Sequence, residues 1–525
     1  MKFGNMRSIL AFILIFLART VLAETSVRIG QNFTGAVFGT DSQATPADGN
    51  GAVGPNHFVQ FLNGNFTVFD KRTGSSVIKI TDETFWANAG VTLTASLSIS
   101  DPRLIFDVYS QRWFAAMIDL RVSSRSPQTN RFLIAVSENS DPSKAWNGAA
   151  VRADSVHGYF ADFPTMGIDE NGVYLSGDLF DRFGNSVGPL VMAFSKPGLL
   201  AIPIDVANRI SSGQLAYSAR GQILQPTVTT GSPSTPELLL SVGDIGVDFA
   251  SHDTLILSSL RNGTNGTLLD NPLTIIVPTY QVPINPVQPG GSDNLDDGDA
   301  RIGAAVRRVD DLVYAVHAIQ TNNHAAIRWY KLDAVTRSLL QAGTITETNL
   351  DLFYPSIAAN EKGNVVIGCN GTSPDVFVSS FAIVGETVNG QLTFGPLRLL
   401  KSGIASYDLH DSSGTSRWGD YSATSLDPSD PGRFWTIQMY PVNATTWATQ
   451  ITELIVGGPT LNVVDNGSSI EISWPDQTGS VLQYNTDLSQ PLAWLPVTEL
   501  PVVLNGQAVV SLPLTNSAAF FRLLQ

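Results

Sequence analysis

Phe163-Pro164-Thr165-Met166-Gly167-Ile168 is a short run of small and apolar residues with a proline near its start. Similar segments occur seven times along the chain, at intervals of about 50 to 75 residues. The other six are Ala52-Val53-Gly54-Pro55, Asp101-Pro102-Arg103-Leu104, Gln225-Pro226-Thr227-Val228, Arg301-Ile302-Gly303-Ala304-Ala305, Tyr354-Pro355-Ser356-Ile357-Ala358-Ala359 and Trp418-Gly419-Asp420-Tyr421-Ser422-Ala423. Recurrence at such spacing is typical of architectures built from repeated units.

Short runs with high β-propensity follow most of these segments, as in Arg131-Phe132-Leu133-Ile134-Ala135-Val136. Gly, Pro, Asn and Asp bound the runs, and helical periodicity is nearly absent after the N-terminus. One segment and its following runs make a four-stranded unit, in which small residues suit the crowded innermost strand. The sequence therefore predicts an all-β protein with a β-propeller of about seven blades.

After Gly457-Gly458-Pro459 the pattern changes to a clean alternation of apolar and polar residues, as in Ile470-Glu471-Ile472-Ser473-Trp474. Such alternation predicts strands with one buried face. We interpret residues 459–525 as a separate small β-sandwich of the immunoglobulin or fibronectin type, and residues 24–457 as the propeller.

The N-terminal residues 1–23 have the features of a secretory signal peptide. Lys2 and Arg7 precede an apolar run from Ile9 to Ala18, and Val21-Leu22-Ala23 forms a cleavage-type end. A lone anchor helix is the alternative. No later stretch approaches the roughly 20 apolar residues that a membrane span needs. We therefore expect a secreted protein, extracellular or periplasmic, without a membrane span.

The formal net charge of the chain is −15, and it becomes −18 when the three cations of the signal are removed. Such a surface repels nucleic acid and anionic lipid heads, which excludes both as partners, whereas it tolerates cations such as Ca²⁺. Cys369 is the only cysteine, so no disulfide can form within the chain. Its strand-like surroundings predict a buried, inert thiol rather than a nucleophile.

Three arginines stand at the start of proposed innermost strands: Arg103, Arg301 and Arg417. In a propeller they could converge at one end of the axial channel, where planar guanidinium groups hold a carboxylate through two hydrogen bonds. Each arginine also has an acid two or three residues away: Asp101, Asp299 and Asp420. The alternative is therefore a set of Arg–Asp pairs that lock neighbouring blades together.

Hydrolysis of a glycoside requires an acid and a nucleophile or base. Tyr421, beside Asp420, is a candidate phenolic nucleophile, but no convincing glutamate is present to activate it.

The densest acidic run contains Asp293, Asp296, Asp297 and Asp299. Clustered carboxylates with a turn glycine could hold calcium, which prefers six to eight oxygen ligands. The spacing does not match an EF-hand loop, because Leu295 occupies a ligand position, so a solvated acidic loop is the alternative.

Several segments resemble a family of large secreted bacterial propeller proteins that has no settled activity. The resemblance spans roughly residues 45–440 and rests on Gly51-Ala52-Val53-Gly54-Pro55-Asn56-His57-Phe58-Val59-Gln60, Ser100-Asp101-Pro102-Arg103, Gln111-Arg112-Trp113-Phe114 and Arg417-Trp418-Gly419-Asp420-Tyr421-Ser422. It implies a propeller related in style to sialidase and Asp-box repeats. The C-terminal piece, with Ser473-Trp474-Pro475 and Phe520-Phe521-Arg522-Leu523, is similar to modules appended to exported proteins of environmental bacteria.

These observations favour a secreted, non-catalytic binding or scaffolding propeller, whose partner is a glycan or an extracellular protein. The first alternative is a sialidase-like glycoside hydrolase that grips acidic glycans with the three arginines. The second is an adhesion protein that attaches through its C-terminal module.

Overall fold

The computed structural model describes residues 27–93, 97–121, 130–243, 251–260, 269–291, 295–296, 298–410, 414, 416–457, 461–476, 480–487, 494–504, 507–514 and 519–524. The predicted signal peptide, residues 1–23, lies outside them. Strands dominate the described part, and none of its helices is long and apolar enough to cross a membrane. The helices are α1 (Asp82–Asn88), α2 (Lys196–Leu199), α3 (Tyr217–Arg220) and the 3-10 turn η1 (Pro289–Gly291).

Within the described residues from Val27 to Val456, strand pairing forms seven antiparallel groups of four strands, each ordered here from its innermost strand outward. The first two groups are β2 (Asn50–Val53), β3 (His57–Leu62), β4 (Asn65–Asp70), β5 (Ser76–Ile80), and β6 (Leu97–Asp107), β7 (Arg112–Arg121), β8 (Arg131–Ser137), β9 (Trp146–Arg152). The next two are β10 (Phe160–Ile168), β11 (Gly172–Phe180), β12 (Ser186–Ser195), β13 (Ile210–Ser211), and β14 (Gln225–Thr230), β15 (Leu238–Val242), β16 (His252–Ser259), β17 (Leu273–Tyr280).

The fifth and sixth groups are β18 (Val306–Val309), β19 (Leu312–Thr321), β20 (His324–Asp333), β21 (Ser338–Ile345), and β22 (Asp351–Ala359), β23 (Asn364–Ser373), β24 (Val376–Val388), β25 (Gln391–Phe394). Strand β24 also pairs with β26 (Arg398–Lys401). The seventh group is β27 (Ala423–Leu426), β28 (Arg433–Asn443), β29 (Thr446–Val456) and β1 (Val27–Val37).

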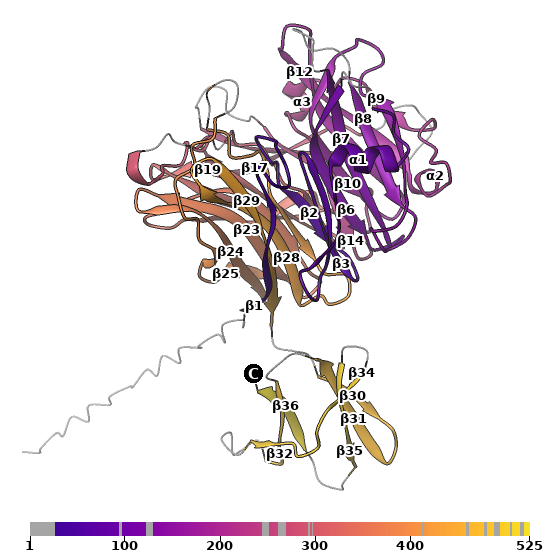
Figure 1. Ribbon diagram of the computed structural model, residues 1–525, viewed down its shortest axis with the longest axis vertical. Coiled ribbons are helices and arrows are strands. Elements are labelled where there is room, and N and C mark those ends of the chain that lie inside the picture. The colour runs from indigo at the N-terminus through magenta and orange to yellow at the C-terminus, as the bar shows by residue number, and fades with distance from the viewer. Residues whose placement is uncertain are drawn as a thin grey trace, which may run out of the picture.

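The innermost strands form a closed ring. Strands β2, β6, β10, β14, β18, β22 and β27 each contact the next, and β27 contacts β2 again. The pairing of β1 with β29 closes the ring at the outer edge, because it places the first described strand in the last group. This arrangement is a β-propeller (Figure 1). The predicted fold class is confirmed, and each of the seven sequence segments overlaps an innermost strand or lies directly before one.

The blades are held together by apolar side chains on both faces of their strands. In β8, residues Phe132 to Val136 are all buried, so the strand has a continuous apolar sequence rather than an alternating one. Phe114 and Ile134 of the second group pack in one cluster with Leu175 and Met192 of the third. Burial between neighbouring blades therefore fixes the ring and keeps the channel residues in register.

Beyond Val456 the chain forms a smaller body of two sheets (Figure 1). One contains β30 (Asn462–Asp465), β31 (Ser469–Pro475), β35 (Gln507–Pro513) and β34 (Val502–Leu504), and the other β33 (Leu495–Pro496), β32 (Val481–Asn485) and β36 (Phe520–Leu524). Trp474 of the first sheet and Leu482 of the second share one buried cluster. Two facing sheets are compatible with the predicted sandwich, while its immunoglobulin character stays a prediction.

Candidate functional site

A recurring backbone feature marks one end of the axial channel. Five residues at the start of innermost strands have left-handed backbone conformation, with φ between 45° and 63°: Asp48, Asp101, Phe163, Ile223 and Tyr354. Three lie at register shifts in the strand pairing. Left-handed conformation is costly for residues other than glycine and concentrates where the fold must aim particular side chains. The repeated strain therefore points to this end of the channel, called the mouth below.

The residue two positions after each left-handed residue ties one blade to the next. Arg103 Nε donates to the Pro164 carbonyl at 2.6 Å, and Thr165 Oγ1 donates to the Leu224 carbonyl at 2.5 Å. Gln225 Nε2 continues the ring by donating to the Ile302 carbonyl at 2.7 Å. These bonds satisfy backbone carbonyls in or just before the innermost strands of neighbouring blades. The mouth is thus a rigid frame rather than a set of loose loops.

The mouth contains a cavity of about 210 Å³. Its charged and aromatic lining comes from Asp296, Asp299, Arg301, His317, Tyr354, Arg417, Asp420 and Tyr421. Arg301 is held by Asp299 through two hydrogen bonds, of 2.7 Å from Nε and 2.6 Å from Nη2. Burial alone would lower the pKa of Arg301, but the Asp299 carboxylate raises it above its usual value.

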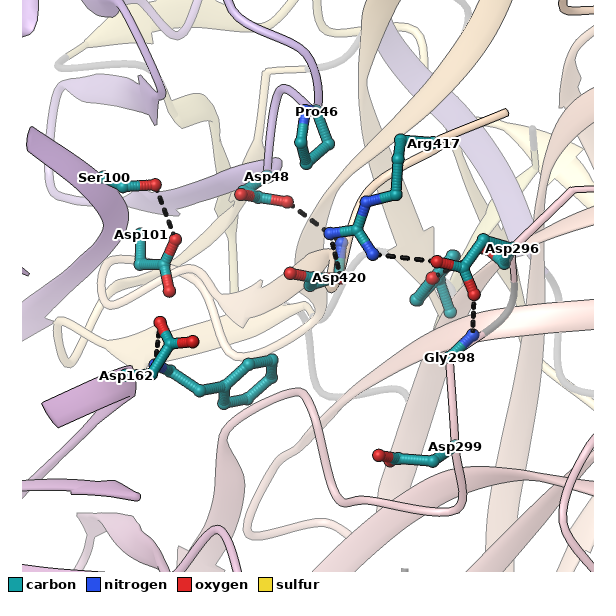
Figure 2. Close-up of polar contacts among 12 residues, drawn as sticks. Pro46, Asp48, Ser100, Asp101, Asp162, Asp296, Gly298, Asp299, Arg417 and Asp420 are labelled. Atoms are coloured by element: carbon teal, nitrogen blue, oxygen red, sulfur yellow. Dashed lines mark hydrogen bonds and ion pairs between the residues drawn. The ribbon is translucent and has the colours of Figure 1, made fainter. Parts of the chain in front are cut away.

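Arg417 is held in the same way by two carboxylates (Figure 2). Its Nη1 lies 2.8 Å from Asp296 Oδ2, and its Nη2 lies 2.9 Å from Asp420 Oδ1. Burial would lower the pKa of Arg417, yet Asp420 and Asp296 raise it. The alternative of Arg–Asp pairing thus describes Arg301 and Arg417, and Asp296 is an additional partner that the sequence analysis did not assign.

Arg103 differs from the other two, because it does not pair with Asp101 as that alternative expected. Its Nε and Nη1 donate to the carbonyls of Pro164 and Gly303 instead. The guanidinium carbon lies 3.7 Å from the centre of the Tyr421 ring. Nη2 is buried and has no hydrogen-bond partner among the described residues. The physical reason is that the left-handed turn at Asp101 separates its carboxylate from Arg103, which extends towards the next blade.

Carboxylates outnumber cations at the mouth, and several crowd together. In Figure 2 the carboxylates of Asp101 and Asp162 point toward one another. Burial, with the charges of Asp162 and Asp420, raises the pKa of Asp101 to about 7. Burial and the charges of Asp420 and Asp101 raise the pKa of Asp48, whose Oδ1 accepts the Asp420 amide at 3.0 Å. Burial and mutual repulsion therefore favour the protonated, neutral form of the carboxyl groups behind the arginines.

Tyr421 lies under this group of charges. Its side chain is 4% exposed, and its hydroxyl has no hydrogen-bond partner among the described residues. Burial and the charge of Asp101 raise the pKa of Tyr421 well above its usual range. A phenol that resists ionisation and lies out of contact with a base is poorly suited to attack a substrate.

The acidic run is only partly described, since Asp293 and Asp297 lie outside the described residues. The carboxylates of Asp296 and Asp299 hold Arg417 and Arg301, so these oxygens already have cationic partners. Across the described residues, no group of three His, Cys, Asp or Glu side chains is arranged to hold a metal ion. Cys369 is buried, and burial raises the pKa of its thiol, as expected of an inert residue.

Sequence reasoning missed three residues of the channel: Asp48, Asp162 and Arg307. Asp162 lies two residues before Pro164, and Asp101 lies directly before Pro102. An aspartate close to the proline of a repeated segment was therefore a signal that could have identified Asp162. Arg307 lies in β18 beside Arg308, and nothing local distinguishes the arginine that faces the channel from the one that does not.

No protein-family model matches the sequence, and no curated protein matches it either. Among solved structures, the chain is similar to the Dos1 propeller, with 9% identity, a TM-score of 0.38, and coverage of 82% of this chain and 95% of that one. It is similar to Kluyveromyces lactis Hsv2, with 9% identity, a TM-score of 0.34, and coverage of 77% and 97%. It is also similar to Trypanosoma rangeli sialidase in complex with the inhibitor DANA, with 10% identity, a TM-score of 0.31, and coverage of 68% and 55%. Similarities this low carry no argument about activity.

Proposed function

We propose that the protein is a secreted, non-catalytic binding propeller that holds a hydroxyl- or amine-rich ligand, such as a neutral or amino-sugar glycan, in the cavity at the mouth. The observation that carries this proposal is that carboxylates of the chain already pair with two arginines of the mouth. Arg301 and Arg417 are bound by three aspartates of the chain itself. A ligand carboxylate would have to displace one of them and approach further buried acids.

The free hydrogen-bonding capacity of the mouth lies in acceptors. An ionised carboxylate offers about four acceptor positions, and the arginines use only some of those on Asp296, Asp299 and Asp420. Hydroxyl and amine groups of a ligand are donors that match these positions. The strained but well-bonded frame holds them in place without the ligand, which reduces the entropic cost of binding.

The alternative of a sialidase-like hydrolase has less support. It needs arginines open to a carboxylate and an activated nucleophile. Arg103 is instead bonded to two carbonyls beneath Tyr421, and the Tyr421 hydroxyl is buried with a raised pKa.

The proposal is tested by applying the purified protein to an array of neutral, amino and acidic glycans, with and without Ca²⁺. We expect binding to neutral or amino glycans that is lost in Asp299→Asn and kept in Asp333→Asn, which changes a turn aspartate outside the mouth. Binding confined to acidic glycans, and lost in Arg301→Met, would overturn the proposal and favour the hydrolase.

A further inference from the structure

The channel behind the mouth has the opposite charge balance. A cavity of about 30 Å³ lies between the innermost strands and is lined by residues of β2, β6, β10, β14, β22 and β27 together with Arg307 of β18. Arg103 and Arg307 both contribute to its lining, and none of the described residues that line it is acidic. Two arginines thus border one small space, and its described lining residues supply no carboxylate to pair with them.

Arg307 has no ion-pair partner among the described residues. Its Nε donates to the Ile357 carbonyl at 3.1 Å, and its Nη2 donates to the Thr424 carbonyl at 2.5 Å. Burial lowers the pKa of Arg307 to about 10. The guanidinium therefore keeps its charge at neutral pH while its contacts to the chain are neutral ones.

Arg103 supplies a second, independent sign of a missing partner. Its side chain is 5% exposed, and its Nη2 has no acceptor among the described residues. A buried N–H without an acceptor is unfavourable, and a buried charge without a counter-charge is more so. Arg103 and Arg307 both belong to the lining of this cavity.

We propose that this mid-channel cavity binds a chloride ion between Arg103 and Arg307. The volume decides the class of anion. Space for one water needs about 10 to 15 Å³ in this measure, so a cavity of about 30 Å³ accommodates one monatomic anion or about two waters. Sulfate, acetate and sugar carboxylates are too large. The hydroxyls of Ser356, Ser422 and Thr424 complete a polar wall.

The site is distinct from the glycan cavity, because the two cavities have no described lining residue in common and carry opposite charge. The chloride ion would neutralise part of the positive charge that Arg103 and Arg307 bring to the space between the innermost strands. Its expected effect is thus on the stability of the propeller, and it does not depend on the proposed glycan binding.

The test is thermal unfolding of the purified protein at constant ionic strength, with chloride replacing sulfate step by step. An ion that binds only the folded state raises the midpoint, by about 3 °C at a hundredfold excess over its dissociation constant. We expect bromide to act like chloride, and acetate to act like sulfate. An unchanged midpoint in all four salts would show that the cavity holds water only, and would overturn the proposal.

Variants assign the effect to the cavity. Arg307→Met keeps the length of the side chain without its charge, and should abolish the response to chloride. Arg433→Met is the matched control, since Arg433 already has Asp430 and Glu453 as partners, and it should keep the response. An unchanged response in Arg307→Met would overturn the assignment. If that variant does not fold, Arg307→Lys serves instead, and the four-salt series on the natural chain decides the matter by itself.

Discussion

The mouth and the middle of the axial channel both contain arginines, but the two regions balance these charges differently. At the mouth, Arg301 and Arg417 are bound by carboxylates, and the nearby acids raise the pKa of both guanidinium groups. In the middle, Arg307 is bound by carbonyls only, and burial lowers its pKa. The arginines of the mouth are thus paired with carboxylates, whereas Arg307 in the middle of the channel has no carboxylate partner among the described residues.

An arginine in a propeller channel is therefore not by itself an anion site. What decides is whether the chain supplies a carboxylate within reach of the guanidinium group. The mouth receives acids from residues just before the innermost strands, whereas the middle is lined by residues within those strands. The mouth should therefore disfavour an anion, and the middle should attract one.

The largest expected effect comes from removing an arginine from each region. Arg417→Ala leaves Asp296 and Asp420 without their cation beside other buried acids, and should lower the free energy of unfolding by about 3 kcal/mol, allowing for partial exposure. Arg307→Met, measured at low chloride, should change it by no more than about 1 kcal/mol, because no acid is left unpaired. Urea unfolding measures both, and equal losses would contradict the comparison.

The second effect concerns pH and has a defined sign. The unfolded Asp101 carboxyl ionises near pH 4, whereas in the folded protein it keeps its proton until about pH 7. The folded state therefore binds more protons between these values, so stability falls as the pH rises from about 4 to 7. Asp101→Asn, whose amide also suits left-handed backbone, should stabilise the protein by about 2 kcal/mol at pH 8 and very little at pH 4.

The control for this prediction is Asp181→Asn, in an exposed turn where hydrogen bonds from Asn185 lower the pKa of the carboxyl. This variant should gain no stability at pH 8. Denaturant titrations at several pH values compare the two. A loss of stability in Asp101→Asn at pH 8 would show that the acids of the mouth are not in excess.

The smallest effect is expected at Tyr421. Tyr421→Phe removes a buried hydroxyl that has no partner among the described residues, and should change the free energy of unfolding by less than about 1 kcal/mol. Tyr421→Leu also removes the ring stacked on Arg103, and should cost about 2 kcal/mol more. Thermal and urea unfolding separate the two variants. Loss of a glycoside hydrolase activity in Tyr421→Phe would instead support a role of Tyr421 as the nucleophile.

The sequence predicted the repeat well because each innermost strand carries its own local signature. The proline at Phe163-Pro164 and Tyr354-Pro355 marks a turn that the chain repeats. The closure through β1 could not be predicted, since it pairs Val27 with Val456 across almost the whole chain. The local sequence pattern of residues 27–37 does not identify the distant strand β29 as their pairing partner.

The candidate site was predicted in part. The sequence identified Arg301 and Arg417 and their neighbours Asp299 and Asp420, because each of these pairs lies within three residues. It misassigned the partner of Arg103, since a left-handed turn reverses the direction that spacing alone suggests. Asp48 and Arg307 come close to the other residues of the channel only because the blades close into a ring. No local sequence pattern specifies that closure.

The most direct test of the opposite charge balance is an anomalous diffraction map of a crystal soaked in bromide. We expect one bromide peak in the mid-channel cavity, within hydrogen-bond reach of Arg307, and no peak against Arg301 or Arg417. A bromide at the mouth beside these two arginines, with the middle of the channel empty, would contradict it.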